Sequence, residues 1–247
     1  MEATLLGLLA STLAGLATGI GAIPTLFRRD FSEEFMDTML GFSAGIMLAT
    51  TFISLLGPAI EQGNPIIAII VMIIGALLIH LVDIFVPHFH PVAGPEGPPS
   101  RISKILLIII AIIIHNFPEG LAVGVSFSFG GIVSGLPVAI AIAVQNVPEG
   151  LMVALPLLRE KIKKSRVAGY TILTGLVEPL GGAVGILALY LIHGILPYTL
   201  AFVAGAMMFV VIDEMIPESH RKGFGRRATF GFFGGFSIMI IIESFFA

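Results

Sequence analysis

Eight apolar runs, each long enough to cross a lipid bilayer, constrain this chain more than any other feature. A membrane-spanning helix needs about 20 predominantly apolar residues. Only 12% of the 247 residues are charged, against roughly 25% in soluble domains. The sequence therefore predicts an all-α membrane protein, folded as a single transmembrane domain over residues 1–247. Its eight predicted spans are 4–26, 34–56, 65–86, 103–126, 132–157, 167–192, 198–216 and 228–246.

The basic residues predict how these spans are oriented. All 13 Lys and Arg residues fall within 28–29, 101–104, 159–166 and 221–227, which are alternate loops between the spans. Loops rich in Lys and Arg face the cytoplasm, so both termini are predicted on the extracytoplasmic side of a plasma or inner membrane. The first residues lack the basic region of a signal peptide, so run 4–26 is predicted to be a span.

The composition also excludes several kinds of site. The chain has no Cys, which rules out thiolate metal ligands, a catalytic cysteine and disulfides. Its net charge of −3 is divided between separate segments and indicates no nucleic-acid partner. The lipid bilayer is the first partner that the sequence predicts.

Two copies of one polar motif interrupt the fourth and fifth apolar runs. His115-Asn116-Phe117-Pro118-Glu119-Gly120 returns as Gln145-Asn146-Val147-Pro148-Glu149-Gly150. Ionisable side chains inside a membrane span are costly and therefore indicate function. On a helix the first, second and fifth residues of each motif share one face, because they are three and four positions apart. A single buried His or Glu can simply be a hydrogen-bonded packing residue, but two matched copies favour a metal or proton site.

Depth and proline positions strengthen the prediction of a metal site. At 1.5 Å per residue, Glu149 lies roughly 15 Å from Arg159, and Glu178 roughly 18 Å from Arg166, both near the middle of a core about 30 Å thick. Pro118, Pro148 and Pro179 are expected to kink their helices and free a backbone carbonyl. A divalent cation would keep the carboxylates ionised. Imidazole, carboxylate and amide, without thiolate or thioether partners, suit Zn²⁺ and also Fe²⁺, Mn²⁺, Co²⁺ or Cd²⁺.

An internal repeat predicts the arrangement of the spans. Leu40-x-Phe42-x-Ala44-Gly45-x-Met47 matches Leu200-x-Phe202-x-Ala204-Gly205-x-Met207 in a span of opposite direction. Spans one to three and six to eight are therefore predicted as inverted repeats around spans four and five, a 3+2+3 arrangement typical of transporters. The alternative is that small residues recur because they let helices pack closely. The Gly181-Gly182 and Gly234-Gly235 faces fit either bundle packing or a homodimer contact.

Together, four motifs resemble those of the ZIP metal-ion transporters, in particular the prokaryotic GufA-like branch. Besides the two copies above, they are Glu178-Pro-x-Gly-Gly and Asp213-Glu-Met-Ile-Pro-Glu218. The resemblance implies transport of zinc, and often of iron, manganese or cadmium, into the cytoplasm, with the metal as substrate and no organic cofactor. It also implies a binuclear site. One metal position would use His115, Glu119, Gln145 and Glu149, and the second Asn116, Glu119, Asn146, Glu149 and Glu178, where some relatives have Asp instead of Asn146.

Further polar residues suggest where a metal ion would leave and enter. Candidate contacts on the cytoplasmic side are His80, Asp83, Asp213, Glu214, Glu218 and His220, although such residues can also be charges solvated by lipid headgroups. The Pro- and Gly-rich loop 87–100 is predicted to be mobile and cytoplasmic, with His88 and His90 as weak metal contacts or ordinary solvated histidines. Candidates on the outer side are Glu61, His193 and Glu243.

Two other classes compete with a transporter. A membrane-embedded hydrolase could use the same metal site to activate water, but the chain has no His-Glu-x-x-His motif and no Ser or Cys nucleophile arrangement. A metal-sensing receptor would need an output domain, and the loops are too short to form one. The sequence thus predicts a transporter and not an enzyme.

Overall fold

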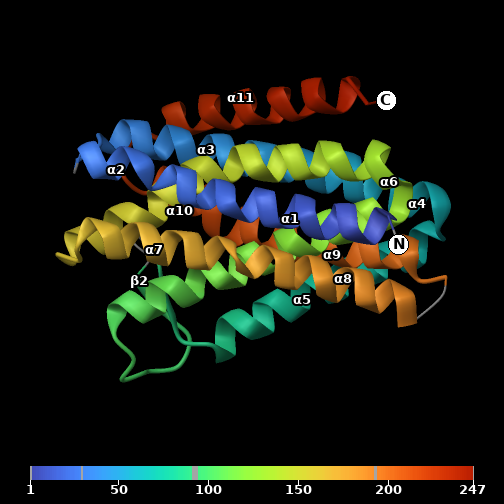
Figure 1. The fold of residues 1–247 in the computed structure, drawn as a ribbon, viewed down its shortest axis with the longest axis horizontal. Coiled ribbons are helices and arrows are strands. Elements are labelled where there is room, and N and C mark those ends of the chain that lie inside the picture. The colour runs from blue at the N-terminus through green and yellow to red at the C-terminus, as the bar shows by residue number, and fades with distance from the viewer. Residues whose placement is uncertain (1, 29, 91–93, 192–193, 247) are drawn as a thin grey trace.

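The computed structural model describes residues 2–28, 30–90, 94–191 and 194–246, which form a bundle of long helices running close to one common axis (Figure 1). In chain order the elements are α1 (Glu2–Gly21), α2 (Ile23–Phe27), α3 (Glu33–Thr50), the π-helix η1 (Thr51–Leu56), α4 (Gly57–Gln62), α5 (Pro65–Phe85), β1 (His88–His90), β2 (Gly94–Glu96), α6 (Lys104–Arg159), α7 (Lys164–Gly175), α8 (Val177–Leu191), α9 (Leu196–Phe209), the π-helix η2 (Val210–Met215), α10 (Ile216–His220) and α11 (Gly225–Ser244).

Among these described residues, six helical segments are long and apolar enough to cross a membrane: Thr4–Phe27, Glu33–Gln62, Pro65–Phe85, Lys104–Arg159, Lys164–Leu191 and Leu196–His220. Five coincide with predicted spans, and Lys104–Arg159 covers the fourth and fifth together. The eighth predicted span is the helix α11, which is not one of the six. The structure thus establishes a helical membrane architecture, and the number of spans is taken up below.

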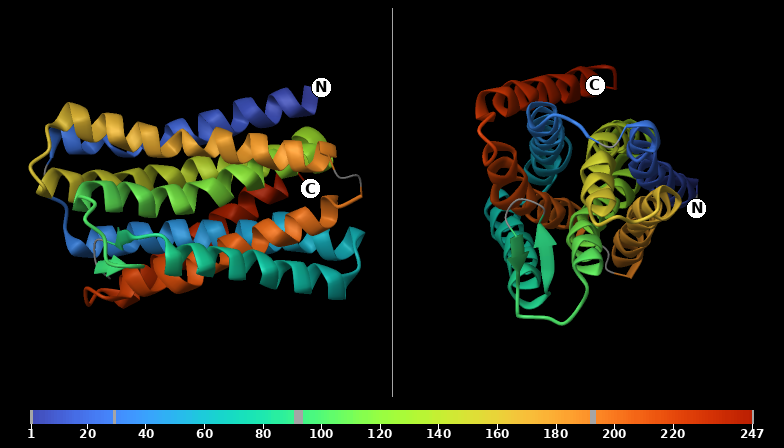
Figure 2. Two further views of the ribbon diagram at one scale, coloured as in Figure 1. Left: turned by 90° about the horizontal axis from the view of Figure 1, so that it is seen from below. Right: turned by 90° about the vertical axis from the view of Figure 1, so that its left-hand side faces the viewer.

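Helix α6 doubles back on itself at two glycines. Gly130 and Gly131 have non-helical φ and ψ, and φ at Gly131 is +62°, a conformation that glycine adopts without strain. Its two arms therefore run side by side (Figure 2), with Gln145 of the second arm bonded to Glu119 of the first. The backbone stays helical through Pro118 and Pro148. Each proline lacks an N–H group, so the carbonyl four residues earlier in the helix loses its hydrogen-bond donor.

Local capping signals explain where three of the helices begin. Ser32 and Ser103 accept hydrogen bonds from backbone N–H groups of α3 and α6, at Phe35 and Leu106. Asn64 caps α5 in the same way, directly before a proline at the first helical position. Such side chains satisfy N–H groups that the helix leaves without a partner, which fixes the start of each helix.

The helices divide into two bundles. The first bundle consists of α1, α6, α7 and α8, and the second of α3, α5, α9 and α11 with the short helices between them (Figure 2). Backbones approach most closely at glycines, and no described glycine makes such an approach between the bundles. The contacts within each bundle include Gly15 with Gly175, Gly150 with Thr18, Gly205 with Met72, and Gly235 with Phe42.

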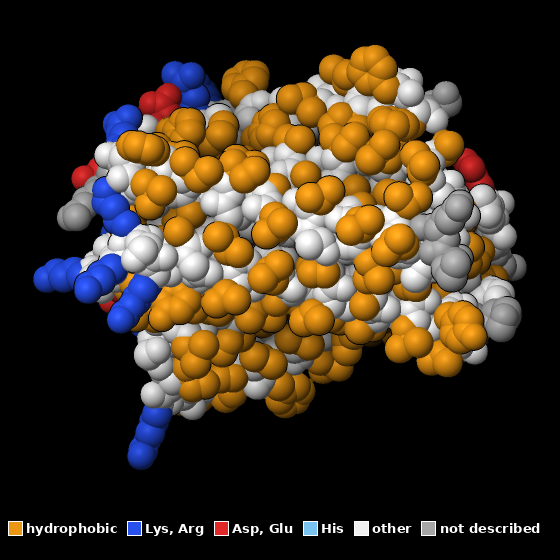
Figure 3. All heavy atoms as spheres, in the orientation of Figure 1, with side chains coloured by type: hydrophobic (Ala, Val, Ile, Leu, Met, Phe, Trp, Pro, Cys, Tyr) orange, Lys and Arg blue, Asp and Glu red, His pale blue; other side chains and the backbone are white. Residues whose placement is uncertain are grey.

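Polar contacts join the two bundles. Ser43 of α3 donates to the backbone carbonyl of Gln145, at 3.0 Å, in the buried centre. One end carries most exposed Lys and Arg side chains (Figure 3) and is called the basic end here. There, Arg159 of α6 pairs with Glu33 of α3 at 3.3 Å. The other carboxylate oxygen of Glu33 pairs with Lys222 of its own bundle. Apolar side chains cover the surface between the two ends, as a lipid-facing surface requires.

The two segments that match in sequence also share an irregularity. Helix α3 continues into η1, and helix α9 continues into η2, so each matched stretch is followed by a π-helical turn. π-Helical turns are rare and often occur at functional sites. The second of them, η2, carries Glu214.

Loop 87–100 differs from its prediction as a mobile, solvated segment. Strands β1 and β2 form an antiparallel hairpin that pairs His88 with Glu96. The side chains of His88 and His90 are turned inward, and the two residues are only 1% and 3% exposed. The reading of these histidines as ordinary solvated residues is therefore wrong, because the hairpin folds them against the helices.

Candidate metal centre

The predicted ligands on α6 and α8 lie together in the buried centre of the first bundle. Gln145 donates from Nε2 to Glu119 Oε1 at 2.7 Å, and Asn146 donates from Nδ2 to Glu178 Oε1 at 2.6 Å. All four residues are fully buried. The neutral amides thus bond to the two carboxylates and hold them in fixed positions.

Local backbone features bring Glu178 to this level. The helix is interrupted at Leu176, so Glu178 stands in the first turn of α8. A Cβ atom at Gly120 would lie 2.0 Å from the carbonyl oxygen of Glu178, so only glycine permits this approach of α6 and α8. Backbone carbonyls of neighbouring helices orient the two asparagines: Asn116 donates to Thr174 at 3.1 Å, and Asn146 also donates to Ala14 at 2.8 Å.

Several buried oxygen atoms remain available in this cluster. They have no hydrogen-bond partner among the described residues, and they are Glu119 Oε2, Gln145 Oε1, Asn146 Oδ1, Glu149 Oε1 and Glu178 Oε2. Buried polar atoms normally have a partner, so each such atom needs an explanation. Carboxylate and amide oxygens are suitable ligands for divalent cations, which makes a metal ion a chemically consistent partner.

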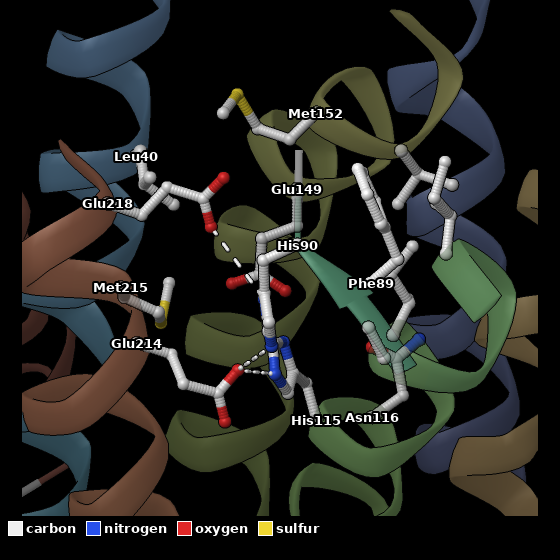
Figure 4. A pocket seen from close by; sticks show the side chains of 14 residues that line it. Leu40, Phe89, His90, His115, Asn116, Glu149, Met152, Glu214, Met215 and Glu218 are labelled. Carbon is white, nitrogen blue, oxygen red and sulfur yellow. Dashed lines mark hydrogen bonds and ion pairs between the residues drawn. The ribbon is translucent and has the colours of Figure 1, made fainter. Parts of the chain in front are cut away.

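A second cluster surrounds His115. Its Nε2 atom contacts Glu214 Oε2, and the same oxygen lies 3.2 Å from His90 Nε2. Potential ligand atoms of His90, His115 and Glu214 all lie within 4.8 Å of one another. His90 Nδ1 is also 3.9 Å from Glu218 (Figure 4). The structure therefore joins His115 of the repeated motif to residues that the sequence assigned to the cytoplasmic exit.

One cavity connects these residues. It has a volume of about 70 Å³ and is lined by residues of both bundles and of β1. His115, Asn116 and Glu149 line it from α6, while Glu214 and Glu218 line it from the second bundle. Its lining extends along α6 from Asn116 of the repeated motif to Ile108, nearer the basic end. Within it, His90 contacts both Glu214 and Glu218 (Figure 4).

A third cluster is built on the hairpin. His88 Nε2 lies 2.9 Å from Asp83 and 3.7 Å from Glu96, and these residues with His90 form a group of potential ligands within 4.8 Å of one another. The sequence prediction missed Glu96. A strand pairing of His88 with Glu96 across the loop could have revealed it, but the Pro- and Gly-rich composition favoured a loop without regular structure.

Two hairpin side chains, His90 and Glu96, have shifted pKa values. Burial lowers the pKa of His90 to about 4, so its ring is neutral near pH 7 and a ring nitrogen keeps a free lone pair. Burial also raises the pKa of Glu96. A neutral imidazole is the form that binds a metal ion.

Of the remaining candidates, Asp213 lines a small pocket with His90, Glu96, Glu214 and Glu218. His80 packs against Phe209 with ring centroids 5.6 Å apart, Asp213 is exposed, and His220 contacts Thr229 at 3.2 Å. On the opposite end, Glu243 accepts a hydrogen bond from Ser54 at 3.2 Å and Glu61 is exposed. His193 lies outside the described residues. Roles for these residues in metal movement stay predictions.

Buried carboxylates, amides and imidazoles at the centre of a helical membrane protein are typical of the class of proteins that handle ions inside the bilayer. Comparison with known proteins gives the family. Residues 99–243 match the model described as "ZIP Zinc transporter". The chain belongs to the ZIP family.

Named relatives cover nearly the whole chain. Zinc transporter GufA of Myxococcus xanthus is 43% identical over 96% of this chain and 97% of the relative. Zinc transporter ZIPB of Bordetella bronchiseptica is 40% identical over 92% of this chain and 77% of the relative. Human zinc transporter ZIP11 is 32% identical over 92% of this chain and 93% of the relative. These relatives confirm the resemblance to the GufA-like branch.

Proposed function

We propose that this protein carries divalent metal ions across the membrane into the cytoplasm, with Zn²⁺ as one substrate. The observation that carries the proposal is the group of buried oxygen atoms between the arms of α6 and α8, joined by His115 to the cavity at the basic end. The names of the relatives, all zinc transporters, agree with it. Fe²⁺, Mn²⁺, Co²⁺ and Cd²⁺ are further proposed substrates, because these ligand types discriminate weakly.

The proposed site is binuclear. One metal position uses His115, Glu119, Gln145 and Glu149, and the second uses Asn116, Glu119, Asn146, Glu149 and Glu178. The hydrogen bonds from Gln145 to Glu119 and from Asn146 to Glu178 support this division, because each amide pairs with a carboxylate of its own position. On this proposal a metal ion replaces the amide donors as the partner of those carboxylates.

The proposed topology has eight spans in a 3+2+3 arrangement. The turn at Gly130 and Gly131 divides α6 into two spans, and α11 supplies the eighth by packing along α3. The π-helices that follow both matched segments support inverted repeats. The basic end faces the cytoplasm and both termini face outwards, in a plasma or inner membrane. A homodimer, also proposed, needs a surface other than Gly181, Gly182 and Gly235, which contact neighbouring helices of their own bundle.

Alternating access is proposed to come from movement of one bundle against the other. Close glycine contacts hold each bundle together, whereas the bundles meet through ordinary side chains and a few polar contacts such as Ser43 with Gln145. On its way out, the metal ion would move from His115 and Glu149 to Glu214. It would then move to His90 and the hairpin cluster. Hydrolase and receptor functions are less well supported, because the named relatives are transporters.

The deciding experiment measures Zn²⁺ influx into proteoliposomes that contain the purified protein and a trapped fluorescent indicator. Glu149→Ala is expected to reduce influx at least tenfold, because Glu149 is assigned to both metal positions. Asp30→Ala, which changes an exposed carboxylate that does not line the cavity, is the control and should retain influx. No influx through the folded wild-type protein would overturn the transport proposal, and normal influx through Glu149→Ala would overturn the site.

A further inference from the structure

The cavity beside His115 has a methionine on each of its two walls. Met152 lines it from α6 of the first bundle, and Met215 lines it from η2 of the second. The motifs that define the candidate ligands contain oxygen and nitrogen donors, so these two thioethers introduce a different ligand chemistry. They are the sulfur-containing residues among those that line the cavity, and neither was named as a candidate ligand from the sequence.

Both methionines share a helix face with proposed ligands. Met152 follows Glu149 by three residues on α6, and Met215 precedes Glu218 by three residues, which places each pair on one side of its helix. In Figure 4 Met215 lies between Glu214 and Glu218, and Met152 lies on the opposite wall beyond Glu149. Met215 is only 5% exposed, so its side chain is held inside the protein beside the two carboxylates.

Thioether sulfur supplies the selectivity that the other ligands lack. Carboxylates and imidazoles bind Mn²⁺, Fe²⁺, Co²⁺, Zn²⁺ and Cd²⁺, whereas a polarizable thioether favours soft cations and adds little for a hard cation such as Mn²⁺. A cation that passes between the two walls would pass one methionine of each bundle. The selective contact would therefore form where the two bundles meet.

We propose that Met152 and Met215 are specificity-determining ligands that favour soft d¹⁰ cations, Cd²⁺ and Zn²⁺, over Mn²⁺ during passage through this cavity. The inference rests on the proposed transport function. Its alternative is that both methionines only fill space, a common role of this flexible side chain. Replacement by Leu tests the difference, because Leu keeps the volume and apolar character and removes only the sulfur.

The first measurement is X-ray absorption at the Cd edge for Cd²⁺-loaded protein in a thiol-free buffer. The chain has no Cys, so any sulfur neighbour of the metal must be a methionine. The wild-type protein is expected to show a sulfur neighbour that is absent from the Met152→Leu/Met215→Leu double variant. Selenomethionine protein, which needs no substitution, should show selenium in its place.

The second measurement is the ratio of Cd²⁺ to Mn²⁺ influx into proteoliposomes at equal, subsaturating concentrations. The double variant is expected to lower this ratio by about threefold or more, which corresponds to roughly 0.65 kcal/mol at about 1.4 kcal/mol per tenfold. Met239→Leu is the matched control, because Met239 is fully buried in α11 away from the cavity. Its ratio should equal that of the wild type.

The outcomes separate the two proposals. An unchanged influx ratio in the double variant, or the absence of a sulfur or selenium neighbour, overturns the specificity proposal while leaving transport intact. Absence of influx of every metal through the wild-type protein overturns the transport function, and the absorption spectrum then still decides whether methionine binds the metal.

Discussion

Asn146 shows what one amide does among buried carboxylates. Its Nδ2 atom donates to Glu178 and to the carbonyl of Ala14, while its Oδ1 atom stays available. An aspartate at this position could not donate either bond and would face Glu178 with a second negative charge. The amide therefore stabilises the site without a cation, and an acid would make the site depend on one.

We predict that Asn146→Asp lowers thermal stability without metal and increases the stabilisation by Zn²⁺. Loss of a buried donated bond costs about 1–3 kcal/mol, and a cation would offset the added charge. Thermal unfolding in detergent, with and without Zn²⁺, measures both effects. Asn146→Ala is the control, since it removes the same donors and adds no charge. Equal Zn²⁺-induced increases in the melting temperatures of the two variants would contradict a metal position beside this residue.

The sequence predicted part of the candidate site because local spacing decides it. The first, second and fifth residues of each motif were expected on one helix face, and Glu178 at the depth of Glu149. The hydrogen bonds from Gln145 to Glu119 and from Asn146 to Glu178 agree with that expectation. The contact of His115 with Glu214 joins residues 99 positions apart. No local pattern determines which side chains η2 presents to α6, so Glu214 could only be placed near the exit.

Among the structural elements, α5 was predicted most closely. Its predicted range, 65–86, differs by one residue from Pro65–Phe85, because Asn64 and Pro65 mark the start and a long apolar run follows. The π-helices and the hairpin were not predicted. A π-helical turn depends on how neighbouring helices pack, and the hairpin is stabilised by burial of His88 and His90 against helices distant in sequence.

Helix α11 offers a test of packing on two adjacent glycines. A Cβ atom at Gly235 would lie 2.0 Å from the carbonyl oxygen of Phe42, whereas one at Gly234 would lie 3.9 Å from the Phe42 ring. Gly235→Ala is therefore expected to lower the free energy of unfolding by about 1–3 kcal/mol through overpacking. Gly234→Ala, at an exposed position in the helix, should instead raise it by about 0.5–1 kcal/mol, because alanine favours the helix more than glycine does. Thermal unfolding of both variants in detergent measures the difference, and equal stabilities would contradict the packing of α11 on α3.

For the whole molecule, the distribution of charge supports one orientation in the membrane. Exposed Lys and Arg gather at one end, and apolar side chains cover the surface between the ends (Figure 3). The positions of the basic residues in alternate loops predicted the first feature. The hydrophobic runs predicted the second, because bilayer thickness sets their length. The division into two bundles was not predicted in this form. It depends on which helices pack closely at their glycines, and the sequence alone does not determine those pairs.

Orientation can be tested with single cysteines, since the chain has no Cys. Lys161 is exposed at the basic end and Gln62 is exposed at the opposite end of the bundle. A membrane-impermeant maleimide applied to intact cells is expected to label Gln62→Cys and to leave Lys161→Cys unlabelled. After permeabilisation both should react, which controls for reactivity. The reverse pattern on intact cells would place the basic end outside and contradict the proposed direction of transport.

Glu33 shares its carboxylate between two cations, Arg159 of the other bundle and Lys222 of its own. If the bundles separate at this end as proposed, the contact with Arg159 breaks and the contact with Lys222 persists. The Glu33 carboxylate then keeps Lys222 as a counterion throughout the movement, and water replaces only Arg159. Breaking this contact costs little free energy, because exposed ion pairs are weak. The energetic barrier to opening would consequently lie in the dry centre, where Ser43 must release the carbonyl of Gln145.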